Sequence, residues 1–203
     1  MDQNGNNKGY IMNSELKEKG FIILKDFIPK SLCNFSKLYF KMKADAMDYT
    51  IDPQCPLSKS FYGDYFTETL LISSIPSLSE VTGLKLLPQY SYTRIYSYGE
   101  ELVRHRDRAS CEFTATVCLG KPEGEDINPI YIQNKMDESN PHIAHLEEGD
   151  LCIFTGTVLD HWRPPLENSW LLQTFIHYTD LNGEYGNRIW DGRYGPGFSS
   201  KAK

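Results

Sequence analysis

The spacing of hydrophobic side chains changes character along the chain. After Pro29, apolar residues recur at helical intervals up to Met47, which predicts a helix there. A second helical pattern covers much of 64–82 and is interrupted near Pro76. From Leu86 onward the pattern becomes a series of short runs rich in β-forming residues, which predict strands. These runs lie at 89–97, 101–105, 111–119, 129–133, 143–146, 150–156 and 171–179.

The rest of the N-terminal part contains three short segments without a helical pattern. Residues 21–24 (FIIL) predict a short strand. Residues 50–63 contain two prolines and a glycine and predict an irregular loop. Residues 1–12, rich in Asn and Gly, are expected to be poorly ordered.

This order of elements predicts an α+β fold. A series of short strands after a helical N-terminal part favours a double-stranded β-helix (jelly roll) core at about 86–180, with the helices as a supporting layer. The 203 residues contain no internal repeat and no low-complexity linker, so we predict a single domain spanning 1–203. Because this architecture carries many functions, the function has to be argued from individual residues.

Charge and cysteine content narrow the range of partners. The net charge of −6 would repel a phosphate backbone, so nucleic acid is not an expected partner. We expect no membrane span, because no stretch approaches the ~18 consecutive apolar residues that one requires. The five cysteines form no CxxC pair, and the polar first residues lack the apolar run of a secretion signal. We therefore expect a cytoplasmic protein with reduced thiols; no pattern specifies its oligomeric state.

A His-x-Asp pair follows the predicted strand at 101–105. On a strand, residues two apart project to the same face, so His105 and Asp107 can reach one ion. A second histidine from a distant strand would complete a set of two imidazoles and one carboxylate, which binds iron(II) and leaves positions open for a co-substrate and dioxygen. The alternative is a surface turn, in which the pair lies between Arg104 and Arg106.

The remaining four of the five histidines are candidates for the third ligand. His161 lies just beyond the run 150–156 and its Gly156 turn, where a strand end could face inward. His142 and His145 flank a predicted loop and strand start, where we expect them to face solvent. His177 is in the last predicted strand, where an inward side chain would be a hydrogen-bond donor behind the ligands. His161 could alternatively be a core or interface histidine.

The order of these residues resembles the 2-oxoglutarate/iron(II)-dependent dioxygenases, and most closely the prolyl 4-hydroxylase-like branch. The resemblance covers roughly residues 86–180. The place of His161 after the Gly-Asp strand start matches the distal histidine of this family, which favours it over the other histidines. The residues that carry the resemblance are Tyr96 and Gly99, His105 and Asp107, Gly149 and Asp150, and finally His161.

The resemblance implies an oxygenase that binds iron(II) and uses 2-oxoglutarate as a co-substrate, with ascorbate as a further possible cofactor. Such enzymes convert 2-oxoglutarate to succinate and carbon dioxide and usually hydroxylate a second substrate, here an amino-acid, peptidyl (including prolyl) or small-molecule one. Related halogenases have a small residue where this chain has Asp107, so the resemblance implies hydroxylation. No catalytic residue beyond the metal ligands is predicted.

The anchor for 2-oxoglutarate departs from the family pattern. Where the prolyl hydroxylase-like branch places a Lys or Arg after the distal histidine, this chain has Trp170, Leu171 and Leu172. A desolvated carboxylate needs a cation, and a guanidinium can bind both of its oxygens. We predict Arg163 as the anchor, with Arg94 as the alternative. The resemblance adds Tyr96, which matches a tyrosine that contacts the co-substrate.

Two other functions are compatible with the same sequence. A non-catalytic jelly-roll binding module would have these strands without a competent metal site. A cupin-type metalloenzyme would use more histidines at the metal, and here it would recruit His142, His145 or His177.

Overall fold

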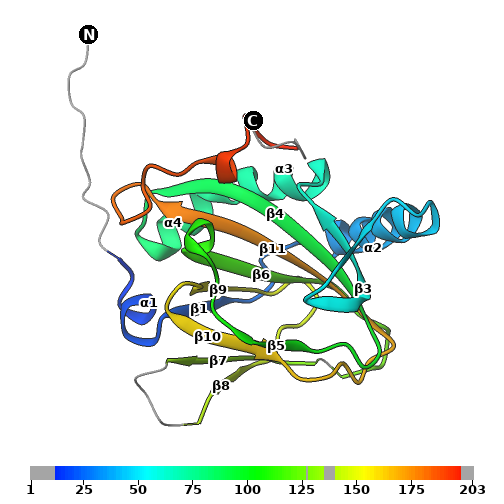
Figure 1. Ribbon diagram of the computed structural model, residues 1–203. Helices are drawn as coiled ribbons and strands as arrows, with labels where there is room; N and C mark the ends of the chain where they lie inside the picture. Colours follow the sequence, from blue (N-terminus) through cyan, green and yellow to red (C-terminus); the bar gives the residue numbers. More distant parts are fainter. Residues whose placement is uncertain (1–11, 127, 135–139, 198–203) are drawn as a thin grey trace.

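Two antiparallel sheets, stacked face to face, form the body of the protein (Figure 1). The computed structural model describes residues 12–126, 128–134 and 140–197. In spatial order, the larger sheet contains β1 (Phe21–Leu24), β9 (Leu151–Thr155), β6 (Phe113–Gly120), β11 (Trp170–Asp180), β4 (Leu86–Ser97), β3 (Cys55–Tyr62) and β2 (Thr50–Asp52). The smaller sheet contains β5 (Leu102–His105), β10 (Leu159–Arg163), β7 (Ile130–Asn134) and β8 (His142–Ala144). The predicted α+β jelly-roll class is confirmed.

Helices cover the face of the larger sheet that points away from the smaller sheet (Figure 1). The helices are α1 (Ser14–Lys19), α2 (Lys30–Asp45), α3 (Tyr65–Ser73) and α4 (Ile75–Thr82), and two 3₁₀ turns follow, η1 (Ala109–Cys111) and η2 (Trp190–Gly192). The predicted interruption near Pro76 is the break between α3 and α4 at Ser74. Asp64 begins α3, because its carboxylate accepts the backbone N–H of Phe66 at 2.9 Å. None of the helices in the described ranges is long and apolar enough to cross a membrane.

The central strands of the larger sheet, β9, β6 and β11, are buried on both faces, which makes them a rigid support. In β6, Ala115 and Val117 pack with Phe40 of α2, whereas Cys118 belongs to a second apolar cluster between the sheets. A fully buried side chain of the size of Val117 or Phe40 contributes roughly 1.5–3 kcal/mol. Alternation along the strands therefore sends every second side chain of β4, β6 and β11 into the space between the sheets.

The predicted loop at 50–63 is wrong, because β2 and β3 form a hairpin there that extends the larger sheet. Pro53 lies in the turn of this hairpin, and Pro56 lies near the start of β3, where a missing backbone N–H is tolerated. β3 pairs with β4 over Lys59 to Tyr62. The strand was hidden in the sequence because two of its buried side chains are serines, Ser58 and Ser60.

Two further elements were not predicted, α1 and β10. In β10, Leu159, His161 and Arg163 are buried, and Asp160 and Trp162 between them are partly exposed. Because two of the three inward residues are polar, the alternation is not visible as a hydrophobic pattern. The expectation of disorder at 1–12 falls, except for Met12, outside the described residues.

Candidate metal centre

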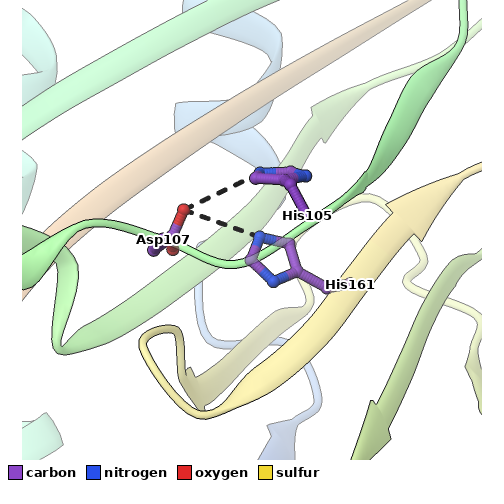
Figure 2. A group of neighbouring side chains, drawn as sticks. All are labelled: His105, Asp107 and His161. Atoms are coloured by element: carbon purple, nitrogen blue, oxygen red, sulfur yellow. Dashed lines mark ion pairs between the residues drawn. The ribbon is translucent and has the colours of Figure 1, made fainter. Parts of the chain in front are cut away.

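His105, Asp107 and His161 converge on one point between the two sheets (Figure 2). Their ligand atoms all lie within 4.8 Å of one another. Asp107 Oδ1 is 3.8 Å from His105 Nε2 and 3.6 Å from His161 Nε2. The convergence follows from strand pairing, since His105 of β5 and His161 of β10 are direct neighbours in the register. The structure thus brings together the three residues that the sequence suggested.

Each of the two histidines is held by a hydrogen bond on the side away from Asp107. His105 Nδ1 lies 2.8 Å from the carbonyl oxygen of Val103, and His161 Nδ1 lies 3.2 Å from that of Leu159. A carbonyl only accepts, so both protons are on Nδ1 in the neutral rings and both Nε2 atoms are free to bind a metal. Burial lowers the pKa of His161, against the opposing effect of Asp107, which favours the neutral, metal-binding form.

Asp107 is fixed by contacts from β6 and from the turn that follows β9. It lies just after β5, where its backbone N–H donates to the carbonyl of Gly156 at 2.9 Å. The hydroxyl of Thr114 donates to Asp107 Oδ2 at 2.6 Å, which leaves Oδ1 to face the histidines. Only a glycine fits at position 156, because a Cβ there would overlap Asp107 Oδ2 and lie 2.5 Å from the carbonyl oxygen of Cys111.

This donor set fits a transition-metal ion. With metal–ligand bonds of about 2.1 Å, ligand atoms at right angles around an ion lie about 3 Å apart. The observed distances from Asp107 Oδ1, 3.6 and 3.8 Å, need only a small contraction. Two imidazoles and one carboxylate on one side of an ion leave its other positions open, as in iron(II) oxygenases.

An ion-pair cluster ties the same two strands together on their outer face. Arg104 Nη2 and Arg106 Nε approach Asp160 at 2.8 and 2.6 Å. Asp160 precedes His161, and the two arginines flank His105, so the cluster lies directly behind the two imidazoles. Both arginines therefore point away from the metal site, as the strand alternation predicts.

A cavity of about 140 Å³ opens beside the three candidate ligands. The ligands and Arg94 lie at different ends of it. Tyr90, His177 and Thr114 are register neighbours beside Asp107, and Arg94 lies four residues further along β4 than Tyr90. Aromatic side chains supply much of the wall between these ends. They are Tyr90, Tyr92, Phe154 and Phe175.

The two predicted anchors, Arg94 and Arg163, are both buried but differ in their partners. Arg94 lines the cavity, binds the carboxylate of Asp52 at 2.7 Å and donates to the hydroxyl of Tyr96 at 3.1 Å. Arg163 is 2% exposed and has no carboxylate partner among the described residues. It donates to the backbone carbonyl of Asn128, and its guanidinium carbon lies 5.8 Å from the ring centre of Tyr96. Neither Arg163 nor Tyr96 belongs to the lining of the cavity as it stands.

Sequence reasoning missed two contributors to the site and placed two histidines correctly outside it. Thr114 was not recognised, because threonine is common in strands; a polar residue alternating with apolar ones in 111–119 was the available signal. Asp52 was missed because its segment was assigned to a loop. His142 and His145 are exposed, as expected.

Comparison with known proteins places the fold. No protein-family model and no curated protein sequence matches the chain. Among solved structures, a prolyl-4-hydroxylase from Pseudomonas putida matches with a TM-score of 0.68 at 16% identity, over 82% of this chain and 95% of that one. A prolyl hydroxylase from Trichoplax adhaerens, in complex with a hypoxia inducible factor peptide fragment, matches with a TM-score of 0.67 at 14% identity, over 82% and 86%.

A third solved structure comes from outside the prolyl hydroxylases. HygX from Streptomyces hygroscopicus, with nickel and 2-oxoglutarate bound, matches with a TM-score of 0.63 at 13% identity, over 85% of this chain and 89% of that one. The fold is therefore that of the 2-oxoglutarate/iron(II) oxygenases, and the resemblance seen in the sequence is confirmed at the level of fold.

Proposed function

We propose that the protein is an iron(II)- and 2-oxoglutarate-dependent oxygenase that hydroxylates an amino-acid, peptidyl or small-molecule substrate. The observation that carries the proposal is the set of three oriented donors, two Nε2 atoms and Asp107 Oδ1, at one end of a cavity in this fold. Bound iron would supply the activation of dioxygen, coupled to oxidative decarboxylation of 2-oxoglutarate to succinate and carbon dioxide.

The chain's own residues would hold the iron and limit the type of reaction. His105, Asp107 and His161 bind one side of the ion and leave the cavity side for co-substrate and dioxygen. Asp107 occupies the position that a halide would need, and this favours hydroxylation over halogenation. With substrate bound, the aromatic walls would limit the access of bulk water to the reacting groups.

The far carboxylate of 2-oxoglutarate would be received by Arg163, with the hydroxyl of Tyr96 as a second contact. Burial lowers the pKa of Arg163, and a buried guanidinium without a carboxylate is stabilised strongly by a ligand anion. Two observations favour Arg94 instead: it already lines the cavity, and it also contacts Tyr96. Its pairing with Asp52 counts against it, because a ligand carboxylate would have to share or displace that partner.

The substrate class is proposed from the solved structures with the same fold. The Trichoplax adhaerens enzyme is in complex with a peptide, and a second HygX structure has hygromycin B bound, so the fold accepts both kinds of ligand. We therefore propose a screen that covers amino acids, proline-containing peptides and hydroxylated small molecules.

The proposal is tested by succinate release under iron(II), ascorbate and 2-oxoglutarate, with Asp107→Ala as the matched inactive control. Anaerobic addition of iron(II) and 2-oxoglutarate should give a weak visible charge-transfer absorption that requires both additions. Absence of both the absorption and metal binding would indicate a non-catalytic module. Retention of metal binding by Asp107→Ala, with its loss in His177→Ala, would instead indicate a cupin-type site.

A further inference from the structure

The hydroxyl of Thr114 lies between Asp107 and His177. Thr114 Oγ1 is 2.6 Å from Asp107 Oδ2 and 3.0 Å from His177 Nδ1. Thr114 and His177 are 2% and 6% exposed, so solvent does not compete strongly for these bonds. They come from neighbouring strands, since Thr114 of β6 is paired with His177 of β11 in the register.

The direction of both hydrogen bonds follows from counting protons. An ionised carboxylate only accepts, so the single hydroxyl proton of Thr114 goes to Asp107. Toward His177, Thr114 can then only accept, which places a proton on His177 Nδ1. The result is a directed chain from His177 Nδ1–H to Thr114 and from the Thr114 hydroxyl to Asp107 Oδ2.

The ring of His177 is itself held firmly. It packs against the ring of Tyr90 with centroids 4.3 Å apart and an angle of 34° between the planes. Burial lowers the pKa of His177 to about 4, so the ring is neutral near pH 7. With the proton on Nδ1, the Nε2 atom of a neutral His177 is unprotonated. The side chain of His177 lines the cavity.

A competing role for His177 is that of a metal ligand. Among the described residues, the candidate ligand atoms of Asp107, Cys111 and His177 also lie within 4.8 Å of one another. However, Cys111 Sγ is 3.1 Å from the hydroxyl of Tyr90, and burial raises the pKa of the thiol well above its usual range. A protonated thiol is a poor ligand, so a second metal ion at this set is disfavoured.

We propose that His177 is a positioning residue for the metal ligand Asp107 and acts through Thr114. These two hydrogen bonds fix Asp107 Oδ2, hold the carboxylate in a one-oxygen binding mode and leave Oδ1 aimed at the metal. The proposal rests on the proposed metal site, and it concerns how tightly and in what geometry that site binds. Hydrogen-bonded partners of metal ligands typically contribute about 10–100-fold to metal affinity.

The test is a double-mutant cycle on cobalt(II) binding, followed by the cobalt absorption spectrum. Thr114→Val should weaken binding about 10–100-fold and His177→Phe about ten-fold. The double variant should bind cobalt no more weakly than Thr114→Val alone, because both substitutions break the same series of hydrogen bonds from His177 to Asp107. Thr114→Ser and His177→Asn, which keep the hydroxyl and a side-chain N–H donor, should restore most of the affinity.

Thr116→Val is the matched control, because Thr116 is a buried threonine on the same strand whose hydroxyl bonds Gln173 at 2.7 Å. Its cobalt affinity and spectrum should equal those of the unsubstituted protein. Additive losses in the double variant would overturn the proposal, as would unchanged cobalt binding in His177→Phe. Failure of the unsubstituted protein to bind cobalt would instead refute the proposed function.

Nitrogen NMR of the zinc-loaded protein provides a readout that does not depend on activity or on the folding of His177→Phe. His177 should carry its proton on Nδ1, and Thr114→Val should remove this preference. A proton on Nε2 of His177 in the unsubstituted protein would contradict the proposed direction of the hydrogen bonds. A His177 signal typical of a zinc-bound nitrogen would assign it as a ligand and also refute the proposal.

Discussion

The two ends of the cavity differ in how complete they are. At the metal end, the side-chain nitrogen or oxygen atom of each ligand that does not face the shared centre has a hydrogen-bond partner within the protein. At the cationic end, Arg94 lines the cavity and Arg163 lies behind the wall, on the other side of Tyr96. Among the described residues, the Nε atoms of both arginines are buried and have no hydrogen-bond partner. The first end is therefore pre-organised by the fold, whereas the second keeps buried guanidinium donors that a ligand anion could still satisfy.

The largest effect is expected from removing a ligand at the metal end. His105→Ala, Asp107→Ala and His161→Ala should each reduce metal affinity and 2-oxoglutarate turnover by orders of magnitude, because each supplies one of three protein ligands. Cobalt(II) titration and succinate release measure the two losses. His142→Ala and His145→Ala, at exposed positions, are the controls and should be near neutral.

A second test disturbs the pre-organisation of the metal end without replacing a ligand residue. Gly156→Ala places a methyl group against Asp107 Oδ2 and 2.9 Å from Thr114 Oγ1, so the carboxylate has to move. We expect a fall of at least ten-fold in metal affinity and a loss of about 1–3 kcal/mol in the free energy of unfolding. Gly124→Ala is the control: its Cβ meets nothing within 4 Å, and its positive φ adds only local strain. Equal metal binding by both variants would show that the crowding is relieved elsewhere.

A third test separates the two arginines at the cationic end. Arg163→Gln should raise the 2-oxoglutarate concentration needed for half-maximal turnover by ten-fold or more, because a charge-assisted pair contributes roughly 1.5–3 kcal/mol. Cobalt affinity should be unchanged, since the guanidinium contacts Asn128 and Tyr96 rather than a metal ligand. The matched variant is Arg94→Gln. If it shows the larger defect and Arg163→Gln shows none, the anchor is Arg94.

The smallest effect is expected at Asp191, which does not line the cavity. Asp191 binds Arg108 at 2.7 Å, next to Asp107 in the chain, and accepts a hydrogen bond from Tyr62 at 3.0 Å. Burial alone would raise the pKa of Asp191, but Arg108 and Ser110 lower it to about 2. A lowered carboxyl pKa stabilises the fold above the unfolded value of about 4, and this contribution is lost as the pH falls toward 2.

Asp191→Asn should therefore reduce the free energy of unfolding by about 1 kcal/mol at pH 7, after allowing for solvent screening of the half-exposed Arg108. Urea unfolding at a series of pH values measures the difference between variant and unsubstituted protein. It should narrow progressively below pH about 4. A difference that stays constant from pH 7 to pH 3 would mean that the charge of Asp191 does not contribute.

The metal end could be predicted from sequence further than the cationic end, for a physical reason. His105 and Asp107 are close in sequence, so short-range geometry is enough to bring them together, and the family pattern then selects His161. Arg94 depends on Asp52, which lies in a hairpin that the prolines and buried serines concealed. The role of Thr114 depends on a cross-strand neighbour that no local pattern reveals.

The outer ion pairs of Asp160 have a consequence for how the chain reaches this structure. Side chains alternate along a strand, so a slip of one residue between β5 and β10 would turn Arg104 or Arg106 into the interior and His105 out to solvent. Asp160 binds both arginines only in the register that also opposes His105 and His161. The folding chain can thus select the correct strand alignment before any ion arrives, and metal loading becomes a late step on two sheets that are already assembled.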